Sequence, residues 1–131
     1  MSGFDLNGKV AVVTGGAGYL GSAIALGFAQ VGARIVILGH SKTKAQAAAQ
    51  EIAQTGVETL GLGIDVLEKD TLVEARQIVL DRFGRVDILV NSAGGNRPEA
   101  TTSSELSFFD LPENTLKDVV DLNFLGTVYP A

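Results

Sequence analysis

Apolar and polar positions along the chain change repeatedly between two periodicities. Short runs rich in Val, Ile and Leu, bounded by glycine or charged residues, are typical of buried strands, and they cover residues 9–14, 34–38, 58–64 and 86–91. Apolar residues at helical spacing predict helices between and after these runs, at residues 20–31, 43–55, 68–83 and 113–125. This alternation predicts an α/β fold, a doubly wound, Rossmann-like parallel sheet with helices on both faces.

The residue pattern also predicts how the helices pack and end. The first helix is expected to pack on the sheet through Leu20, Ile24, Phe28 and Val31. The third is expected to do so through Leu72, Ala75, Val79 and Phe83. The second is rich in alanine and glutamine and is expected to face solvent. The first three helices are each followed by a glycine, which predicts left-handed ends at Gly32, Gly56 and Gly84.

The first strand leads through a glycine-rich turn into the first helix. Gly15, Gly18 and Gly21 are spaced three residues apart. Such a turn lets backbone N–H groups approach a pyrophosphate, which the helix N-terminus also attracts. At the first strand–helix junction of an α/β pattern this favours dinucleotide binding, and the alternative is a turn that only permits close helix–strand packing.

Composition narrows the class of protein. The 131 residues are expected to form one dinucleotide-binding domain, residues 1–131, with 46% hydrophobic and 19% charged residues. A net charge of −5 without a basic run argues against a nucleic-acid partner. With no cysteine and one histidine, His40, no metal site is expected. Residues 1–8 lack a secretion pattern and no apolar run has membrane-spanning length, so a cytoplasmic protein is expected.

A long irregular stretch, residues 93–112, follows the fourth strand. It leaves the carboxyl edge of the sheet, where open α/β sheets bind ligands. A loop of this length is either a substrate-facing lid or a floppy insertion. The pair Phe108 and Phe109 favours a loop that docks.

Four segments, in order, resemble motifs of the short-chain dehydrogenase/reductase family. They are Thr-Gly-Gly-Ala-Gly-Tyr-Leu-Gly at 14–21, Asp65-Val66, Asn-Ser-Ala-Gly at 91–94, and Asp-Leu-Asn-Phe-Leu-Gly-Thr at 121–127. The resemblance covers residues 6–128. It implies hydride transfer between NAD(P) and a ketone or secondary alcohol, catalysed by an oxidoreductase.

The resemblance also implies roles for individual residues. Cofactor contacts are implied for Thr14, Gly15, Gly18, Tyr19, Leu20, Gly21, Asp65, Val66, Asn91, Ala93 and Gly94. Asp65 would accept a hydrogen bond from the adenine amine, although an aspartate there could instead cap the third helix. Asn123 would hold a water in a catalytic proton relay, although a buried asparagine could also be a satisfied core amide.

The sequence differs from the family pattern in two places. Tyr19 replaces the usual middle glycine, a spacing nearer the extended, epimerase-like branch, but the later motifs argue against that branch. The family's Tyr-x-x-x-Lys pair would lie beyond Ala131, which predicts an incomplete fold, the N-terminal cofactor-binding half of an enzyme. The alternative is a non-catalytic or truncated nucleotide-binding module. The 131 residues alone are expected to be inactive and aggregation-prone, because Val119, Val120, Phe124 and Tyr129 would be exposed.

Cofactor preference depends on the end of the second strand. NAD-specific members carry an aspartate there, which binds the ribose 2′-OH and repels a 2′-phosphate. This sequence has Gly39, followed by His40, Ser41 and Lys42, which could contact a phosphate or be ordinary loop residues. NADP is therefore favoured slightly over NAD.

Residues 93–98 and 123–127 resemble a narrower subgroup of the family, the D-mannonate oxidoreductases (fructuronate reductases) of the short-chain type. This resemblance implies a sugar acid such as mannonate or fructuronate as the small-molecule substrate. Asn96 and Arg97 would lie near it, with Arg97 paired to its carboxylate, although Arg97 could equally be a solvated loop residue. The family also implies a homo-oligomer, a dimer or tetramer, for the full-length protein.

Overall fold

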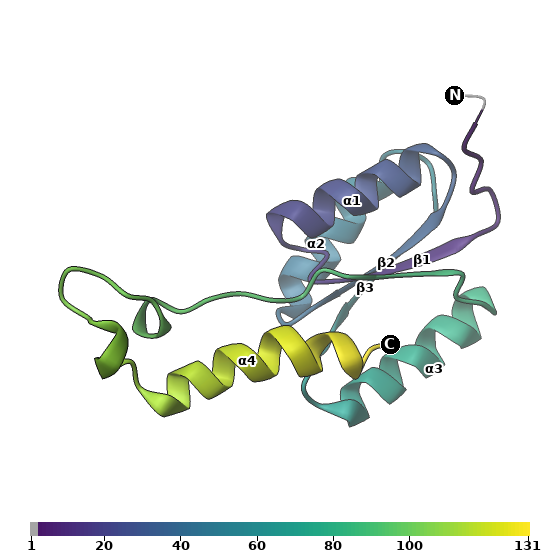
Figure 1. Ribbon diagram of the computed structural model, residues 1–131. Coiled ribbons are helices and arrows are strands. Elements are labelled where there is room, and N and C mark those ends of the chain that lie inside the picture. The colour runs from purple at the N-terminus through teal and green to yellow at the C-terminus, as the bar shows by residue number, and fades with distance from the viewer. Residues whose placement is uncertain (1–2) are drawn as a thin grey trace.

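A computed structural model describes residues 3–131 and contains a four-stranded parallel sheet in the order β3-β2-β1-β4 (Figure 1). The strands are β1 (Val10–Thr14), β2 (Arg34–Gly39), β3 (Thr59–Gly63) and β4 (Ile88–Asn91). All three pairings are parallel. The predicted doubly wound α/β architecture is confirmed, with strand ends shifted by one or two residues from the sequence prediction.

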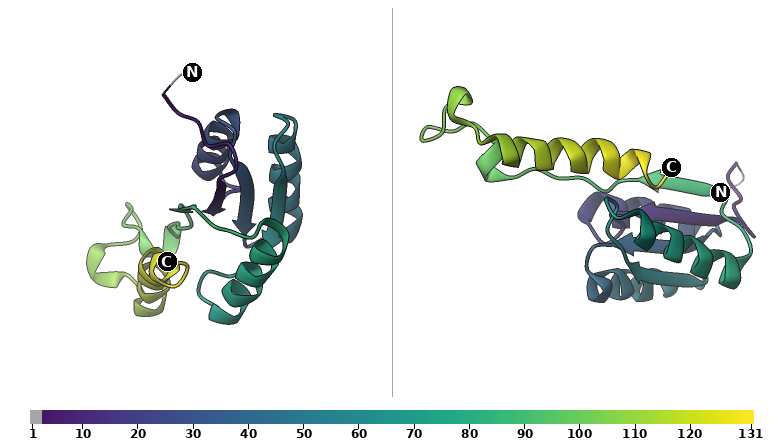
Figure 2. Two further views of the ribbon diagram at one scale, coloured as in Figure 1. Left: turned by 90° about the vertical axis from the view of Figure 1, so that its right-hand side faces the viewer. Right: turned by 90° about the horizontal axis from the view of Figure 1, so that it is seen from below.

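Helices cover both faces of the sheet (Figures 1 and 2). They are α1 (Tyr19–Gln30), α2 (Lys42–Ala53), α3 (Lys69–Phe83) and α4 (Glu113–Val128), with two short 3₁₀ turns, η1 (Pro98–Ala100) and η2 (Phe108–Asp110). One core lies between the sheet and α1 and α2, and the other between the sheet and α3, with Leu122 of α4 packed against it. The two central strands, β1 and β2, are buried on both faces because the two cores take alternate residues of each strand.

The predicted packing face of α1 is wrong in part. The buried residues are Gly21, Ala25 and Ala29, whereas the side chain of Leu20 is 67% exposed. Of the predicted stripe, Phe28 still packs against the core from the edge of this face. Because the residues at the contact are small, α1 lies close to the sheet. The first turn of α1 is thereby placed beside the end of β1.

The expectation that α2 faces solvent is also wrong in part. Ala45, Ala49 and Ile52 are buried against the sheet. The approach to β3 is so close that a Cβ built on Gly61 would lie 2.5 Å from the Ala45 carbonyl oxygen. The alanines of α2 therefore have two effects: they favour the helix, and they allow it to pack closely against β3. For α3, the predicted stripe is confirmed, with Ala75, Val79 and Phe83 buried.

Positive φ values confirm the three predicted left-handed glycines. The angles are +97° at Gly32, +98° at Gly56 and +76° at Gly84. At Gly84, the backbone N–H donates to the Leu80 carbonyl oxygen at 2.8 Å and ends α3. These positions favour glycine because a Cβ is strained in that region.

A charged pair ties the start of β1 to the start of β4. The Arg85 guanidinium donates to both carboxylate oxygens of Asp87 at 2.6–3.0 Å, and the Val10 N–H donates to Asp87 Oδ2 at 2.9 Å. The hydrogen bonds from Arg85 make the largest contribution to lowering the pKa of Asp87, and the bond from the Val10 N–H makes the next largest. A carboxylate with a lowered pKa stabilises the fold at neutral pH, and this contribution is lost as the pH falls through that pKa.

The segment between β4 and α4 projects beyond the sheet, together with the first turns of α4 (Figures 1 and 2). The expected docking of its phenylalanines is wrong, since Phe108 is 71% and Phe109 is 91% exposed. The two rings contact each other edge to face, with centroids 5.5 Å apart. The loop is therefore ordered around short turns without burying its aromatic pair.

The exposed apolar face of α4 differs from the predicted one. Val120 and Phe124 are exposed as expected, but Val119 and Tyr129 are half-buried. The exposed stripe is completed by residues four positions away on either side, Leu116 and Val128. Within residues 3–131, no helix is long and apolar enough to cross a membrane.

Candidate dinucleotide site

The glycine turn begins where β1 ends. Gly15 has a φ of +62°, and its carbonyl oxygen accepts a hydrogen bond from the Gly18 N–H at 3.0 Å. Gly18 precedes the first residue of α1, and no side chain among the described residues caps this helix. Because the first N–H groups of a helix have no partner within the helix, those of α1 are available to an anion at the turn.

Close contacts explain why the turn requires glycine at three positions. A Cβ built on Gly15 would lie 2.8 Å from the Ser92 carbonyl oxygen, and one on Gly21 would lie 2.6 Å from Ser92 Oγ. At Gly16, which sequence reasoning did not single out, a Cβ would lie 2.9 Å from the Val13 carbonyl oxygen. At Gly18 the nearest atom would be 3.2 Å away. Close packing therefore accounts for glycine at these positions, and it does not distinguish a turn that only packs from one that also binds a ligand.

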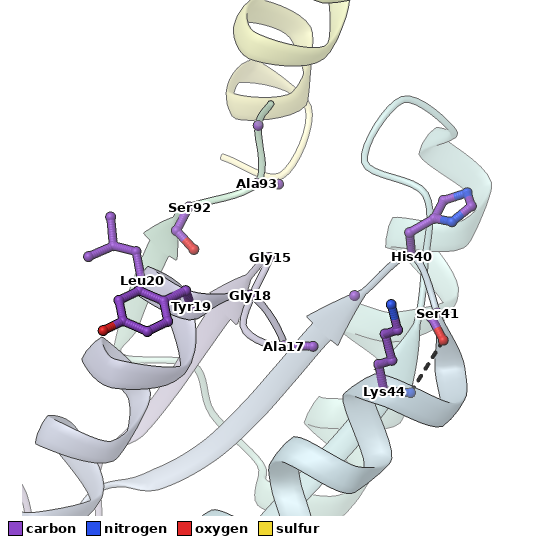
Figure 3. A pocket seen from close by; sticks show the side chains of 13 residues that line it. Gly15, Ala17, Gly18, Tyr19, Leu20, His40, Ser41, Lys44, Ser92 and Ala93 are labelled. Atoms are coloured by element: carbon purple, nitrogen blue, oxygen red, sulfur yellow. Dashed lines mark hydrogen bonds between the residues drawn. The ribbon is translucent and has the colours of Figure 1, made fainter. Parts of the chain in front are cut away.

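A cleft of about 530 Å³, here called the turn cleft, lies over this turn (Figure 3). Its walls come from the turn, the end of β2, the first turn of α2 and the segment after β4: Gly15, Ala17, Gly18, Tyr19, Leu20, Gly21, Gly39, His40, Ser41, Lys44, Ser92, Ala93 and Gly94. In Figure 3, Tyr19 and Leu20 lie on one side of the turn, and His40, Ser41 and Lys44 on the other. The structure thus gathers most of the predicted cofactor residues in one place.

The cation in the turn cleft is Lys44 rather than Lys42. Lys42 begins α2, and its Cβ lies next to Gly63 of β3. Ser41 Oγ accepts a hydrogen bond from the Lys44 N–H at 3.3 Å, which caps α2. No acidic side chain belongs to the part of the cleft wall that the structure describes. This end of the turn cleft therefore suits an anionic group.

A second cleft of about 300 Å³, here called the side cleft, adjoins the first at His40. It lies between the segment after β3, residues 95–97 and α4: His40, Asp65, Leu67, Gly95, Asn96, Arg97, Asp118, Val119, Asp121 and Leu122. Asp65 Oδ1 accepts a hydrogen bond from the Leu67 N–H at 2.9 Å. The alternative that Asp65 caps α3 is wrong, since the cap position is Glu68.

Arg97 and Asn96 form part of the wall of the side cleft. The Arg97 guanidinium donates to Asp118 Oδ2 at 3.1 Å, with both side chains more than half exposed. Asn96 Nδ2 donates to Thr101 Oγ1 at 2.9 Å, and Asn96 Oδ1 accepts from the Arg97 N–H. The loop thus holds Arg97 across the outer side of the cleft, where its charge is balanced by Asp118.

Asn123 is exposed, not buried as expected, but both the nitrogen and the oxygen of its amide are hydrogen-bonded. Its Nδ2 donates to the carbonyl oxygens of Gly95 at 2.7 Å and Val119 at 2.8 Å. Its Oδ1 accepts from the Gly95 N–H at 3.3 Å and has room for one further hydrogen bond. The side chain therefore fixes the segment after β4 to α4.

Besides Asn123, three of the predicted site residues line neither cleft. Thr14 is fully buried, and its Oγ1 donates to the Val90 carbonyl oxygen and accepts from the Ala93 N–H, joining β1 to the end of β4. Val66 is buried in the core under α3 and α4. Asn91 Oδ1 is buried and has no hydrogen-bond partner within residues 3–131.

Sequence reasoning missed Ser92 and Lys44. Ser92 Oγ donates to the Thr14 carbonyl oxygen at 2.6 Å and lines the turn cleft. Lys44 lies within the predicted helix, where nothing local marks it as facing a ligand. For the part of the chain that the structure describes, no three His, Cys, Asp or Glu side chains lie together in a group that could hold a metal ion.

Comparison with known proteins agrees with this geometry. The family model described as short chain dehydrogenase matches residues 9–131. A Bacillus subtilis protein named uncharacterized oxidoreductase UxuB is 40% identical over an alignment of 130 positions, which covers 93% of this chain and 47% of that protein. The chain spans about half the length of the curated relatives it matches.

Two solved structures extend the comparison. A Haemophilus influenza protein, provisionally assigned as a D-mannonate oxidoreductase and solved with bound NAD, is 35% identical with a TM-score of 0.92. The match covers 97% of this chain and 49% of that one. An NADPH-dependent 3-quinuclidinone reductase from Rhodotorula rubra is 27% identical with a TM-score of 0.81, covering 97% and 46%.

Proposed function

The chain belongs to the short-chain dehydrogenase family, and from this premise we propose that its two clefts bind one nicotinamide dinucleotide. The observation that carries the proposal is the glycine turn, which opens beneath the turn cleft beside the uncapped start of α1. Backbone N–H groups and the helix dipole together suit a pyrophosphate there. No side-chain cation is required for this contact.

The residues that line the two clefts suggest how the two halves of the ligand lie. The adenine fits the side cleft, where Asp65 Oδ1 already accepts from Leu67 and the second carboxylate oxygen can accept from the exocyclic amine. The other half then passes Ala93 and Gly94, whose small size admits a ribose or nicotinamide ring. When bound, the nicotinamide supplies the hydride-transfer chemistry, and the protein supplies orientation.

NADP is the preferred cofactor in this proposal because the rim of the turn cleft carries Lys44 and His40 and no acid at Gly39. Lys44→Ala is expected to weaken NADPH binding about tenfold, because charged hydrogen bonds contribute about 1.5–3 kcal/mol. NADH, which has no 2′-phosphate, should lose less than about twofold. Calorimetric titration with each cofactor makes the comparison.

Lys42→Ala provides the matched control for Lys44→Ala, because both lysines lie in the first turn of α2 and only Lys44 lines the cleft. The control is expected to change neither affinity. Equal losses of NADPH affinity in both variants would mean that Lys44 acts only through the overall charge of the surface. This result would contradict its assigned role.

We propose further that the full-length protein is an oxidoreductase acting on a small ketone or secondary alcohol, with a sugar acid such as mannonate or fructuronate as substrate. The subgroup resemblance and the 35%-identical Haemophilus structure support this class. The bond from Arg97 to Asp118 uses Nη1 alone, so the remaining guanidinium N–H groups are the ones that would pair with a substrate carboxylate. The open acceptor position on Asn123 Oδ1 is where a water of the proton relay would be held.

Activity separates this proposal from the alternative of a non-catalytic nucleotide-binding module. The full-length protein is assayed with keto sugar acids and NADPH or NADH, following loss of the reduced nicotinamide absorbance. Turnover of a sugar acid supports the oxidoreductase. Cofactor binding without turnover on ketones or alcohols supports the binding module.

The exposed stripe on α4 supports the proposal of a homo-oligomer. Leu116, Val120, Phe124 and Val128 recur every four residues and are 38–63% exposed. Contiguous apolar surface of this kind is typical of faces that are covered in an assembly. The same stripe supports the expectation that residues 1–131 alone tend to aggregate.

A further inference from the structure

We propose that Ser92 is a positioning residue that holds the glycine turn open for the pyrophosphate. This inference rests on the proposed dinucleotide function. Ser92 follows the end of β4, and its hydroxyl donates to the Thr14 carbonyl oxygen at 2.6 Å. Thr14 is the last residue of β1, so the bond fixes the point from which the turn departs.

The position of this bond distinguishes it from ordinary sheet contacts. Thr14 and Asn91 are paired in the sheet, and beyond that pair both segments leave strand conformation. The Ser92 hydroxyl and the bond from the Ala93 N–H to Thr14 Oγ1 at 3.2 Å hold the two departing segments together. The first residue of the turn, Gly15, then has the φ of +62° that directs the turn over the start of α1.

Ser92 also contacts the other end of the turn. Its Oγ occupies the space into which a Cβ on Gly21 would project, and its carbonyl oxygen occupies the space beside Gly15. One small residue thus touches the beginning and the end of the turn, and it lines the turn cleft from the β4 side (Figure 3). A larger side chain at this position would displace α1 or the turn, and an apolar one would release Thr14.

The test compares ligands that use the turn with one that does not. In Ser92→Ala, affinity for ADP and NADPH is expected to fall about tenfold, since a net hydrogen bond is lost and its acceptor is left partly buried. Affinity for adenosine, which has no phosphate, should change less than about twofold. Nuclear magnetic resonance titration measures all three ligands, and circular dichroism checks that the variant is folded.

Two further variants keep the result interpretable. Ser92→Cys keeps a side-chain donor, which is weaker and slightly larger than the hydroxyl, and should lose ADP affinity by an intermediate factor. This variant provides the measurement if Ser92→Ala does not fold. Ser104→Ala removes an exposed hydroxyl in the loop after β4 and should match wild type.

Each outcome decides the inference. Selective loss for ADP and NADPH supports it, whereas equal losses for all three ligands, or no loss, overturn it, because Ser92 is then only structural or irrelevant. A wild-type protein that binds neither ADP nor NADPH overturns the proposed function itself and the inference with it.

Discussion

Replacing Gly21 by alanine is expected to weaken dinucleotide binding about 100-fold. The added Cβ would lie 2.6 Å from Ser92 Oγ and closer still to the Gly15 carbonyl oxygen. The second neighbour is backbone and cannot rotate away, so the turn or α1 must move, at a cost of about 1–3 kcal/mol. Titration with NADPH and a thermal melt of the same sample measure both consequences.

Gly27→Ala is the matched control, because Gly27 lies in the same helix. A Cβ there would have no atom within 4 Å among the described residues. The change should leave cofactor affinity at the wild-type value and raise the free energy of unfolding by about 1 kcal/mol, since alanine has the higher helix propensity. If both variants bind NADPH like wild type, close packing of the turn is irrelevant to the site.

Gly39→Asp is expected to reverse the cofactor preference. Gly39 ends β2 and lines the turn cleft, and a Cβ there would meet Ala45 Cβ at 3.5 Å and Ala17 Cβ at 3.7 Å, which are ordinary contacts. The side chain is therefore accommodated, and its carboxylate would face a 2′-phosphate. Such like-charge contact costs several kcal/mol, so NADPH affinity should fall about 100-fold while NADH affinity is retained or improved.

Gly39→Asn separates charge from size. The asparagine has the same shape as aspartate without the charge, and it should weaken NADPH binding less than about tenfold. Titrations of both variants with NADPH and NADH give the four affinities needed. An identical loss of NADPH affinity in both variants would show that the effect is steric and would remove the electrostatic basis for NADP preference.

Features of this fold that depend on local sequence were predictable. The strands, the positive-φ glycines after α1, α2 and α3, and the turn at Gly15 follow from residue types that strongly restrict the backbone. The parallel orientation of the strands followed from the regular alternation of strands and helices. The site at the carboxyl ends of the strands followed in turn, because consecutive loops meet at that edge.

Features that depend on the distance between elements were not predictable. The contact face of α1 follows small residues rather than Leu20, because α1 lies too close to the sheet for a large side chain. Whether Lys42 or Lys44 faces the cleft depends on the rotation of α2 about its axis. A shift of one residue in the start of the helix is enough to change this rotation. Phe108 and Phe109 looked like docking residues, and only the tertiary structure shows their exposure.

The most direct test of the central claim is a calorimetric titration of the protein with NADPH and with NADH. We expect one saturable site per chain, with NADPH bound about tenfold more tightly than NADH. Tighter binding of NADH would contradict the cofactor preference alone. A folded protein that shows no saturable binding of either cofactor up to about 1 mM would contradict the assignment of the two clefts to a dinucleotide.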